Sequence, residues 1–221
     1  PTLVSKSVTD REIDHYAARA AGGTGLVITG ACAIAFPYGA ASMKEPGLSE
    51  DRFIPGLKAL ADAVHAAGGK LCIQSTHHGK VARVDTANDR PVLAPSMPTY
   101  SYDMSALADS TPEELARMGA ATAGKQNTFK EMTHEDIDWL VETWADAAER
   151  IAKAGCDAIE IHAAHGYILG VFLNQRDNLR TDEYGGPLAN RARLACRVIT
   201  DEVSGTPLVL PIGRHHRPAT P

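Results

Sequence analysis

The sequence predicts an α/β fold, specifically a (β/α)8 TIM barrel of which only a part is present. Short runs rich in β-branched residues alternate with longer amphipathic stretches, which is typical of parallel βα units. Glycines precede the predicted strands, whereas unusual polar residues follow them. A dinucleotide-binding sheet would instead place a GxGxxG motif directly after its first strand. The glycines therefore favour a barrel, whose active-site face lies at the carboxyl ends of the strands.

Two helices and two strands are predicted in the first third of the chain. Each helix carries apolar residues at helical spacing and is followed by a pair of glycines that ends it. The strand after each glycine pair is a short, mainly apolar run, as expected of a parallel strand that is buried on both faces. The helices span Asp10–Ala21 and Phe53–Ala67, and the strands span Gly25–Thr29 and Lys70–Gln74.

Residues 96–132 interrupt this alternation with a long connection. Thr111 is followed by Pro112 and, three residues after the threonine, by Glu114. This is a capping box with proline in the first turn, so the connection is expected to contain a short helix of its own. Long connections are either surface excursions or lids over a site, and the sequence leaves both open.

A long helix is expected after the connection. Thr133 is its predicted N-cap, and Asp136 occupies the capping-box position three residues later. Gly155 ends the helix. Apolar residues at helical spacing form the face that we expect in the core. They are Ile137, Leu140, Val141, Trp144, Ala148 and Ile151.

The last predicted elements bring the number of strands to four. They are a strand at Asp157–His162, a helix at Leu188–Val203 and a strand at Pro207–Ile212. A full barrel typically needs about 250 residues, so four strands make up half of one. We predict one partial barrel domain over residues 1–221, containing about strands 2 to 5, with the excursion just described and an atypical tail at 205–221.

Composition indicates a soluble protein that acts on small molecules. The chain is 44% hydrophobic and 22% charged, as globular domains are, and its net charge of -5 gives no general attraction to nucleic acid or to an anionic membrane. The sequence contains no run of 18 apolar residues, and its first residues lack the pattern of a signal peptide. The four cysteines form no closely spaced pair. We expect a cytoplasmic protein with reduced thiols and without a nucleic-acid or membrane partner.

The most specific chemistry lies between Ile161 and Arg193. His162, His165 and Tyr167 follow the end of a buried strand, on the face where catalytic groups collect in a barrel. By spacing alone, these side chains could be zinc ligands, a pair of oxyanion donors or polar residues that tie down a loop. The residue pattern leaves these three interpretations open.

The pattern NxRTDEYGGPxxNRxRL that follows resembles the stretch after the catalytic strand in the Old Yellow Enzyme family of flavin oxidoreductases. That family includes bacterial ene-reductases and 2,4-dienoyl-CoA reductases. Three further stretches resemble the family in the same order, so the resemblance covers about residues 10 to 205. They are Gly25–Thr29 with Ala31 (second strand), Gln74 followed by His77-His78-Gly79-Lys80 (third strand with HxGR), and Ala94-Pro95-Ser96 (third loop).

The resemblance implies an enzyme that holds FMN, is reduced by NADH or NADPH, and passes a hydride to the C=C bond of an α,β-unsaturated carbonyl compound. His162 and His165 are implied to hydrogen-bond the carbonyl oxygen of this enone or enoyl substrate, where enolate charge develops. Tyr167 is implied to deliver the proton. Gln74 matches a glutamine at the pyrimidine edge of the flavin, and Ala31 matches a small residue whose backbone touches the flavin.

The other motif residues are expected to fix the long loop and the next helix. They are Arg180, Asp182, Tyr184, Gly185, Gly186, Asn190 and Arg191. The role of His77 is ambiguous, and Cys32 is either close to the flavin or filler. No metal site is expected, because a set of His162, His165 and His77 lacks a carboxylate in a convincing ligand position.

The resemblance also places parts of the family barrel outside this chain. The first strand of the family precedes Pro1, and the last three, which hold the FMN phosphate on backbone amides and an arginine, are absent. A further arginine, over the flavin pyrimidine, is expected after Val203, where Arg214 is the candidate. The chain alone is therefore expected to bind FMN weakly or not at all.

An open half-barrel leaves strand edges unpaired and apolar faces bare, which predicts association, for example as a homo-oligomer. The alternative to an enzyme is thus a non-catalytic half-barrel that pairs with itself or with another chain. A third possibility is the barrel part of an iron–sulfur flavoprotein such as a dienoyl-CoA reductase, with the cluster bound by cysteines in the missing part.

Overall fold

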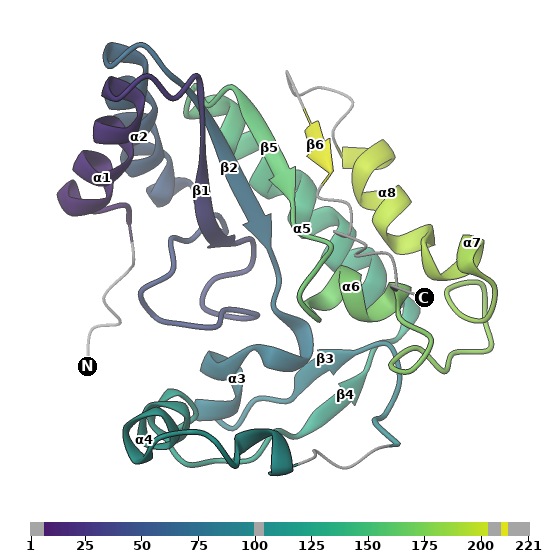
Figure 1. Ribbon diagram of the computed structural model, residues 1–221. Coiled ribbons are helices and arrows are strands. Elements are labelled where there is room, and N and C mark those ends of the chain that lie inside the picture. Colours follow the sequence, from purple (N-terminus) through teal and green to yellow (C-terminus); the bar gives the residue numbers. More distant parts are fainter. Residues whose placement is uncertain (1–6, 100–103, 203–208, 212–221) are drawn as a thin grey trace, which may run out of the picture.

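The computed structural model describes residues 7–99, 104–202 and 209–211. Its main body is a parallel four-stranded sheet in the order β1-β2-β5-β6, with each strand beside the next one along the chain (Figure 1). The prediction of four parallel, neighbouring strands is confirmed, although both ends of the last predicted strand lie outside the described residues. The strands span Leu26–Ala33 (β1), Lys70–Thr76 (β2), Ala158–Ile161 (β5) and Val209–Pro211 (β6).

Four helices form one layer against the sheet, and α2 and α5 lie behind it in Figure 1. In this layer α1 packs against α2, α2 against α5, and α5 against α8. A doubly wound sheet would carry helices on both faces, so the one-sided layer indicates consecutive βα units of a barrel. The helices span Asp10–Ala21 (α1), Ile54–Ala66 (α2, after a 3-10 turn at Asp51–Phe53), His134–Lys153 (α5) and Arg193–Glu202 (α8).

The sheet has one buried and one open face. Trp144 of α5 donates its Nε1–H to Ser75 Oγ at 2.9 Å, which identifies the face that meets the helices. Ile73 lies on this face because side chains alternate along a strand, and it is fully buried. On the opposite, concave face, Leu26 and Ile28 are 36% and 41% exposed. That face is the interior of a closed barrel, so its exposure fits a barrel segment.

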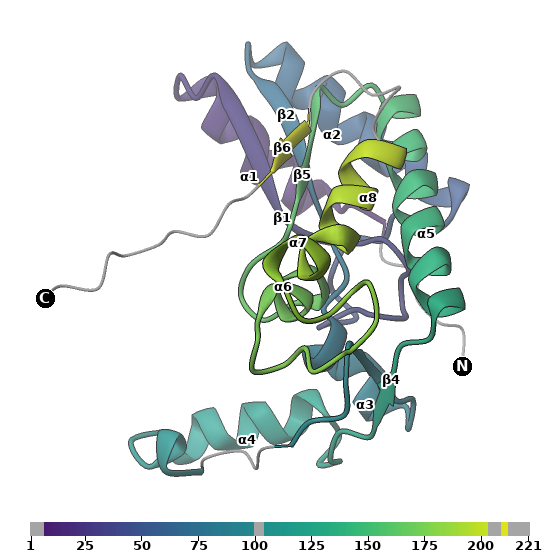
Figure 2. The ribbon, with the colours of Figure 1, turned by 90° about the vertical axis from the view of Figure 1, so that its right-hand side faces the viewer.

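The long connection between β2 and α5 contains a two-stranded sheet of its own and extends below the carboxyl ends of the main strands (Figures 1 and 2). Glu114 N–H donates to Thr111 Oγ1 at 3.2 Å, which confirms the predicted capping box. The short parallel pair β3–β4 was not predicted, because three-residue strands carry no periodic signal. The connection comprises a 3-10 turn at Gly79–Val81, α3 (Arg83–Ala87), β3 (Val92–Ala94), a 3-10 turn at Met104–Leu107, α4 (Pro112–Ala121) and β4 (Phe129–Glu131).

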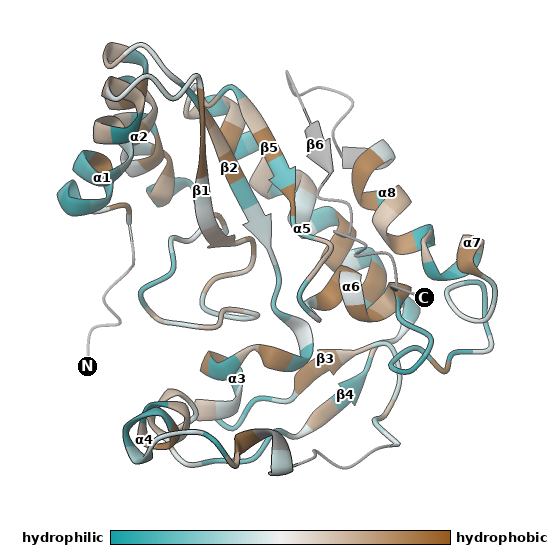
Figure 3. Cartoon of the chain, in the orientation of Figure 1, coloured by the Kyte–Doolittle hydropathy of each residue, from teal (hydrophilic) through white to brown (hydrophobic). Residues whose placement is uncertain are grey.

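The helix α5 forms as the sequence predicts. Asp136 N–H donates to Thr133 Oγ1 at 3.2 Å, and the Asp136 carboxylate accepts from the Thr133 N–H at 2.9 Å. The predicted apolar face is buried against the sheet and α8. Figure 3 colours hydrophobic residues brown, and α6 and α8 contain several of them. Within the described residues, no helix is both long and apolar enough to cross a membrane.

The single helix expected over Leu188–Val203 is instead two helices, α7 at Leu188–Arg191 and the α8 described above. Arg191 is buried, and its guanidinium donates to the carbonyl oxygens of Leu173 and Gly186. These bonds hold the single turn of α7 against the preceding segment. The helix α8 instead packs against α5. Apolar periodicity could not reveal the break, because both parts keep helical spacing.

Candidate active site

A bulge in β1 brings Ala31 beside Gln74. The register between β1 and β2 shifts between Ile28, which pairs with Cys72, and Ala31, which pairs with Gln74. Thr29 lies in this bulge, and its hydroxyl accepts a hydrogen bond from the Gln74 backbone N–H at 3.0 Å. The extra residue is thus accommodated without leaving that amide unpaired. The two residues implied to contact a flavin are therefore direct neighbours.

The Gln74 side chain is held by Glu160 of β5. The two residues pair in register, and Gln74 Nε2 donates to Glu160 Oε2 at 3.2 Å. Gln74 Oε1 accepts no hydrogen bond from the described parts of the chain, so the oriented amide keeps an acceptor available. Sequence reasoning missed Glu160. The available signal was its position two residues before His162, because residues two apart on a strand face the same side of the sheet. That spacing would have predicted that Glu160 lies on the same side as His162.

The His162 ring is oriented by the turn that follows β5. Ala164 N–H donates to His162 Nδ1 at 3.2 Å. A neutral imidazole that accepts at Nδ1 carries its proton on Nε2, and His162 Nε2 lies 3.0 Å from His165 Nδ1. His162 therefore donates to His165, whose own proton is left on Nε2. His165 has a φ of 53°, a left-handed conformation that non-glycine residues rarely adopt.

Burial lowers the pKa of His162, and the neighbouring His165 lowers it further. His162 is thus held in the neutral form at neutral pH. The pair consequently offers two linked N–H donors at the end of β5. Donors of this kind can stabilise an oxygen on which negative charge develops.

The ring of Tyr167 contacts two imidazoles. Its centroid is 4.5 Å from that of His162 and 4.3 Å from that of His78. Tyr167 immediately precedes α6, which spans Ile168–Leu173. Burial raises the pKa of the Tyr167 phenol, and the Glu45 carboxyl raises it further. The phenol is therefore protonated at neutral pH and able to donate.

Five of the six predicted site residues lie at one edge of the sheet. His162 N–H donates to the Ser75 carbonyl at 3.1 Å, so Gln74 and His162 lie at the same end, as predicted. The sixth, Arg214, and all of the tail at 205–221 except residues 209–211 lie outside the described residues. The five are Ala31, Gln74, His162, His165 and Tyr167.

His77 is a core histidine. Its ring is 1% exposed and lies edge-on to Tyr38 and Trp139. Burial, with a smaller contribution from the neighbouring His78, lowers the pKa of His77 to about 3, so the ring is neutral. A Cβ atom on Gly39, whose φ is 71°, would lie 2.3 Å from this ring, so the loop after β1 can pass His77 only because position 39 is glycine.

The RTDEYGG motif fixes the loop between α6 and α7. The Arg180 guanidinium donates to the carbonyl oxygens of Pro95 and Met132, next to the ends of β3 and β4, and forms an ion pair with Asp182. Asn178 donates to the Tyr184 carbonyl at 2.8 Å. These contacts fix the loop, as the sequence predicts, and those of Arg180 also join it to the excursion.

One group of potential metal ligands, in the part of the chain that the structure describes, is close enough to be considered. It consists of His134, Asp182 and Glu183 on the surface. Asp182 already pairs with Arg180, and the cluster is separate from the His162 pair. We assign it no role in the candidate site.

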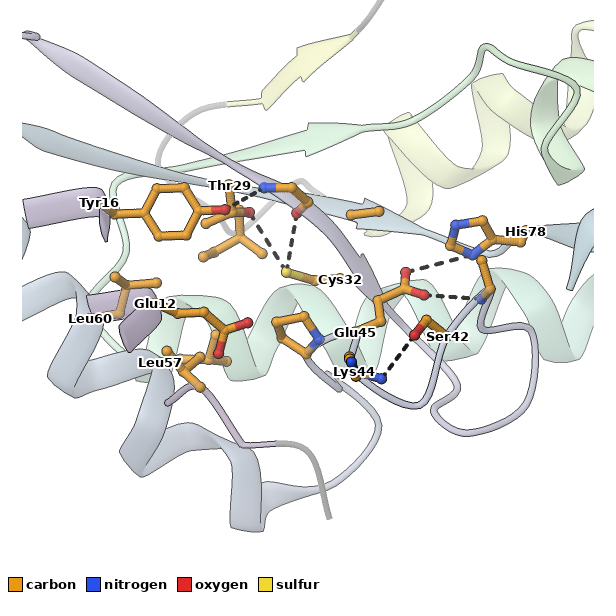
Figure 4. Close-up of a pocket in the computed structure, with 16 residues that line it drawn as sticks. Glu12, Tyr16, Thr29, Cys32, Ser42, Lys44, Glu45, Leu57, Leu60 and His78 are labelled. Atoms are coloured by element: carbon orange, nitrogen blue, oxygen red, sulfur yellow. Dashed lines mark hydrogen bonds and ion pairs between the residues drawn. The ribbon is translucent and has the colours of Figure 1, made fainter. Parts of the chain in front are cut away.

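A cavity of about 360 Å³ lies beside β1, between α1, α2 and the loop at 41–46 (Figure 4). Cys32 lines it and lies 3.4 Å from the Gly30 carbonyl oxygen. Burial raises the pKa of Cys32 to about 12, so its thiol is not a nucleophile at neutral pH. Glu45 and His78 line the end of the cavity that is farthest from Tyr16. Because His78 also contacts Tyr167, it lies between the cavity and the candidate site.

Comparison with known proteins gives a consistent family. The chain is 39% identical over 189 residues to the NADPH dehydrogenase of Halalkalibacterium halodurans, covering 86% of this chain and 48% of that protein. It is 38% identical over 192 residues to a metal reductase of Desulforamulus reducens, covering 87% and 25%. The chain thus spans about half the length of the similar NADPH dehydrogenase and a quarter of the metal reductase.

Solved structures agree. An Old Yellow Enzyme from Pichia superposes with a TM-score of 0.75 at 30% identity, covering 94% of this chain and 52% of that one. A 2-naphthoyl-CoA reductase superposes with a TM-score of 0.72 at 28% identity, covering 94% and 30%. The described sheet is accordingly an incomplete TIM barrel. Since residues 4–206 match the family as a whole, this chain belongs to the NADH:flavin oxidoreductase / NADH oxidase family.

Proposed function

We propose that the complete barrel is an FMN-dependent oxidoreductase that uses NADH or NADPH to reduce the C=C bond of an α,β-unsaturated carbonyl compound. The observation that carries this proposal is the arrangement after β5, where two linked neutral imidazoles lie next to a protonated phenol. Such a set can hold a carbonyl oxygen and supply a proton beside it. The family membership and the similarity to NADPH dehydrogenases support the redox cofactors.

The residues at the strand ends fit the edge of a flavin ring. The Gln74 amide, held by Glu160, keeps its carbonyl as an acceptor for a ring N–H, and Ala31 lies beside it in the bulge. FMN bound here and reduced by NADH or NADPH would supply the hydride. The phosphate has no counterpart in this set, and the resemblance assigns it to strands that this chain does not contain.

In the proposed reaction the substrate carbonyl oxygen accepts hydrogen bonds from the Nε2–H groups of His162 and His165, so His162 exchanges its bond to His165 for one to the substrate. As the hydride reaches the β-carbon, enolate charge grows on that oxygen, and the two donors stabilise it more than they stabilise the ground state. Tyr167 then transfers its phenolic proton to the α-carbon, and the phenolate regains a proton from solvent.

The test uses a complete barrel, made by joining this chain to the remaining part of the Halalkalibacterium halodurans NADPH dehydrogenase. Its flavin is reduced by NADPH without oxygen and then mixed with an enone such as cyclohexenone. We expect the oxidised flavin spectrum to return at a rate that depends on the enone concentration. A reduced flavin that reoxidises with oxygen but not with any enone would contradict the ene-reductase assignment and leave a general NAD(P)H oxidoreductase.

The exposed concave face favours a second candidate for the chain by itself, a half-barrel that does not hold flavin and associates through its open face. The iron–sulfur alternative places its cysteines outside this chain, and no observation on the described residues favours it.

A further inference from the structure

A buried carboxyl group with one unsatisfied oxygen lies next to the candidate site. Glu45, on the loop after β1, is 8% exposed. Its Oε2 accepts a hydrogen bond from the Ala41 N–H at 3.0 Å, whereas its buried Oε1 has no hydrogen-bond partner. That oxygen lies 3.6 Å from His78 Nδ1 (Figure 4). Carboxyl groups in such places are costly to keep charged, so the arrangement requires an explanation.

The protonation of His78 follows from its neighbours. His78 Nδ1 lies 3.1 Å from the Gly39 carbonyl oxygen, which can only accept, so Nδ1 carries the proton. The same N–H therefore points at a carbonyl oxygen and, slightly farther away, at Glu45 Oε1. Burial lowers the pKa of His78 to about 4, which keeps the ring neutral at pH 7.

The His78 ring also supports Tyr167. Its centroid lies 4.3 Å from that of the phenol, so His78 contacts the phenol ring as His162 does. No motif accounts for this contact, because His78 occupies the position that the HxGR pattern leaves open and Glu45 lies outside every stretch that resembles the family. A buried chain of contacts thus runs from Glu45 through His78 to the proposed proton donor.

Charge on Glu45 would oppose the work of Tyr167. The phenol becomes a phenolate when it gives up its proton, and a neighbouring carboxylate disfavours that anion. Burial raises the pKa of Glu45 to about 8, although hydrogen bonds from Ala41 and Ser42 act in the opposite direction. Glu45 is thus mainly protonated at pH 7 and ionises under mildly alkaline conditions.

The other ionisable groups around the pair come from several elements. Arg83 of α3 lies near both His78 and Tyr167 and favours the phenolate, whereas Cys32 of β1 is neutral. Glu12 of α1 is the other carboxyl group that lines the cavity. Among the described residues, the groups around the pair are Glu12 and Tyr16 of α1, Cys32 of β1, Lys44 of the same loop, His77 after β2, Arg83 of α3, and His162 and Tyr167 after β5.

We propose that Glu45 and His78 are positioning residues for Tyr167: the His78 ring holds the phenol, and the Glu45 carboxyl, by staying protonated, keeps negative charge away from it. The role in proton transfer rests on the function proposed above. The coupling between Glu45 and Tyr167 is a property of this chain that can be measured without flavin or substrate.

The first test is an NMR titration of the 221-residue chain with ring-labelled tyrosine, in which Tyr167→Phe identifies the Tyr167 signal. In the parent chain this signal should shift as Glu45 ionises near pH 8, below the ionisation of Tyr167 itself. Glu45→Gln, which keeps the shape and removes the charge, should abolish that step. Glu12→Gln, at the other acid of the cavity, is the matched control and should retain it. A step that is absent from the parent, or that persists in Glu45→Gln, overturns the coupling.

The second test measures enone reduction by the complete barrel as a function of pH. The parent rate should fall about threefold to tenfold as Glu45 ionises, because the new carboxylate disfavours the phenolate that Tyr167 becomes when it gives up its proton. Glu45→Gln should remove this fall and leave flavin reduction by NADPH unchanged. The same alkaline fall in both proteins contradicts the inference, whereas an absence of enone reduction in both contradicts the proposed function and leaves the NMR result standing.

The contact made by the His78 ring is tested separately. His78→Ala should slow enone reduction, and His78→Phe should restore most of the rate because it keeps a ring against Tyr167. Thermal unfolding of both variants reports whether they fold. Equal losses in two folded variants would contradict a role for the ring contact.

Discussion

Tyr167 is the residue at which proton transfer can be separated from packing. Replacing Tyr167 by Phe removes the hydroxyl but keeps a ring in contact with His78 and His162. In a complete barrel we expect flavin reduction by NADPH to continue, while reoxidation by an enone slows by about two to four orders of magnitude, the usual contribution of general acid catalysis.

Rapid mixing of each half-reaction measures this difference. His162→Ala is the comparison, because it should weaken binding of phenols and enones as well as slow hydride transfer. If Tyr167→Phe reduced enones at the parent rate, Tyr167 would not be the acid.

Residue types and spacing were sufficient to predict that His162, His165 and Tyr167 lie together after β5, since they belong to one short segment, but only the resemblance implied their roles. They were not sufficient for Glu45, Glu160 and His78. Glu45 reaches the site only through the path of a loop whose backbone passes His77 at Gly39. The tautomer of His162 likewise depends on one backbone N–H in the folded turn and has no signature in the sequence.

At the scale of elements, Asp157 joins three of them at the amino end of the sheet. This residue precedes β5, and its carboxylate accepts from His65 of α2 at 2.6 Å and from the Leu71 N–H of β2 at 2.9 Å, and pairs with Lys70. Burial alone would raise the pKa of Asp157, but these hydrogen bonds lower it to about 2. The stabilisation is therefore present above the unfolded pKa of about 3.9 and is lost as pH falls towards 2.

We expect Asp157→Asn to lower the free energy of unfolding by about 1 kcal/mol at pH 7, a value limited by solvent screening of these partly exposed groups. The difference from the parent should shrink between about pH 4 and pH 2. Urea unfolding at several pH values measures it. Asp62→Asn, on the exposed face of α2, is the control and should have little effect at any pH. A difference that stayed constant down to pH 2 would contradict the ionic origin.

The long, regular elements were predictable because each combines a capping signal with a consistent period. Thr133, Asp136 and the apolar face of α5 are the clearest case. The β1 bulge was not predictable, since it depends on the Thr29 hydroxyl replacing a strand partner of Gln74. The division between α7 and α8 depends on carbonyl groups from the preceding loop that accept from Arg191.

At the scale of the whole molecule, the flavin contacts proposed above concern the ring, and the family resemblance assigns the phosphate to later strands of the barrel. We therefore expect the purified 221-residue chain to bind FMN weakly or not at all, because Ala31, Gln74 and the His162 pair offer no partner for a dianion. Gel filtration with added FMN should separate the flavin from the protein. A yellow protein with stoichiometric FMN would contradict this expectation.

The open face should drive association of the isolated chain. Ile28 is 41% exposed on the concave face, and we expect Ile28→Lys to weaken self-association at least about tenfold, because burying a lysine at an apolar contact is unfavourable. Sedimentation velocity over a range of concentrations measures the change. Leu188→Lys, at a 63% exposed position on α7, is the matched control. Equal effects of the two substitutions would indicate general stickiness and not association through the concave face.

The strand order has a consequence for synthesis. Within the four-stranded sheet, β2, β5 and β6 each pair with the strand of that sheet that precedes them in the chain, so the sheet can grow in one direction while the chain leaves the ribosome. The donors after β5 can then take their positions once β5 has added to β2, before β6 joins the sheet. A nascent chain that ends after α6 would already contain the three proposed catalytic side chains, His162, His165 and Tyr167. The elements α7, α8 and β6 would then be added to a site whose first side is already formed.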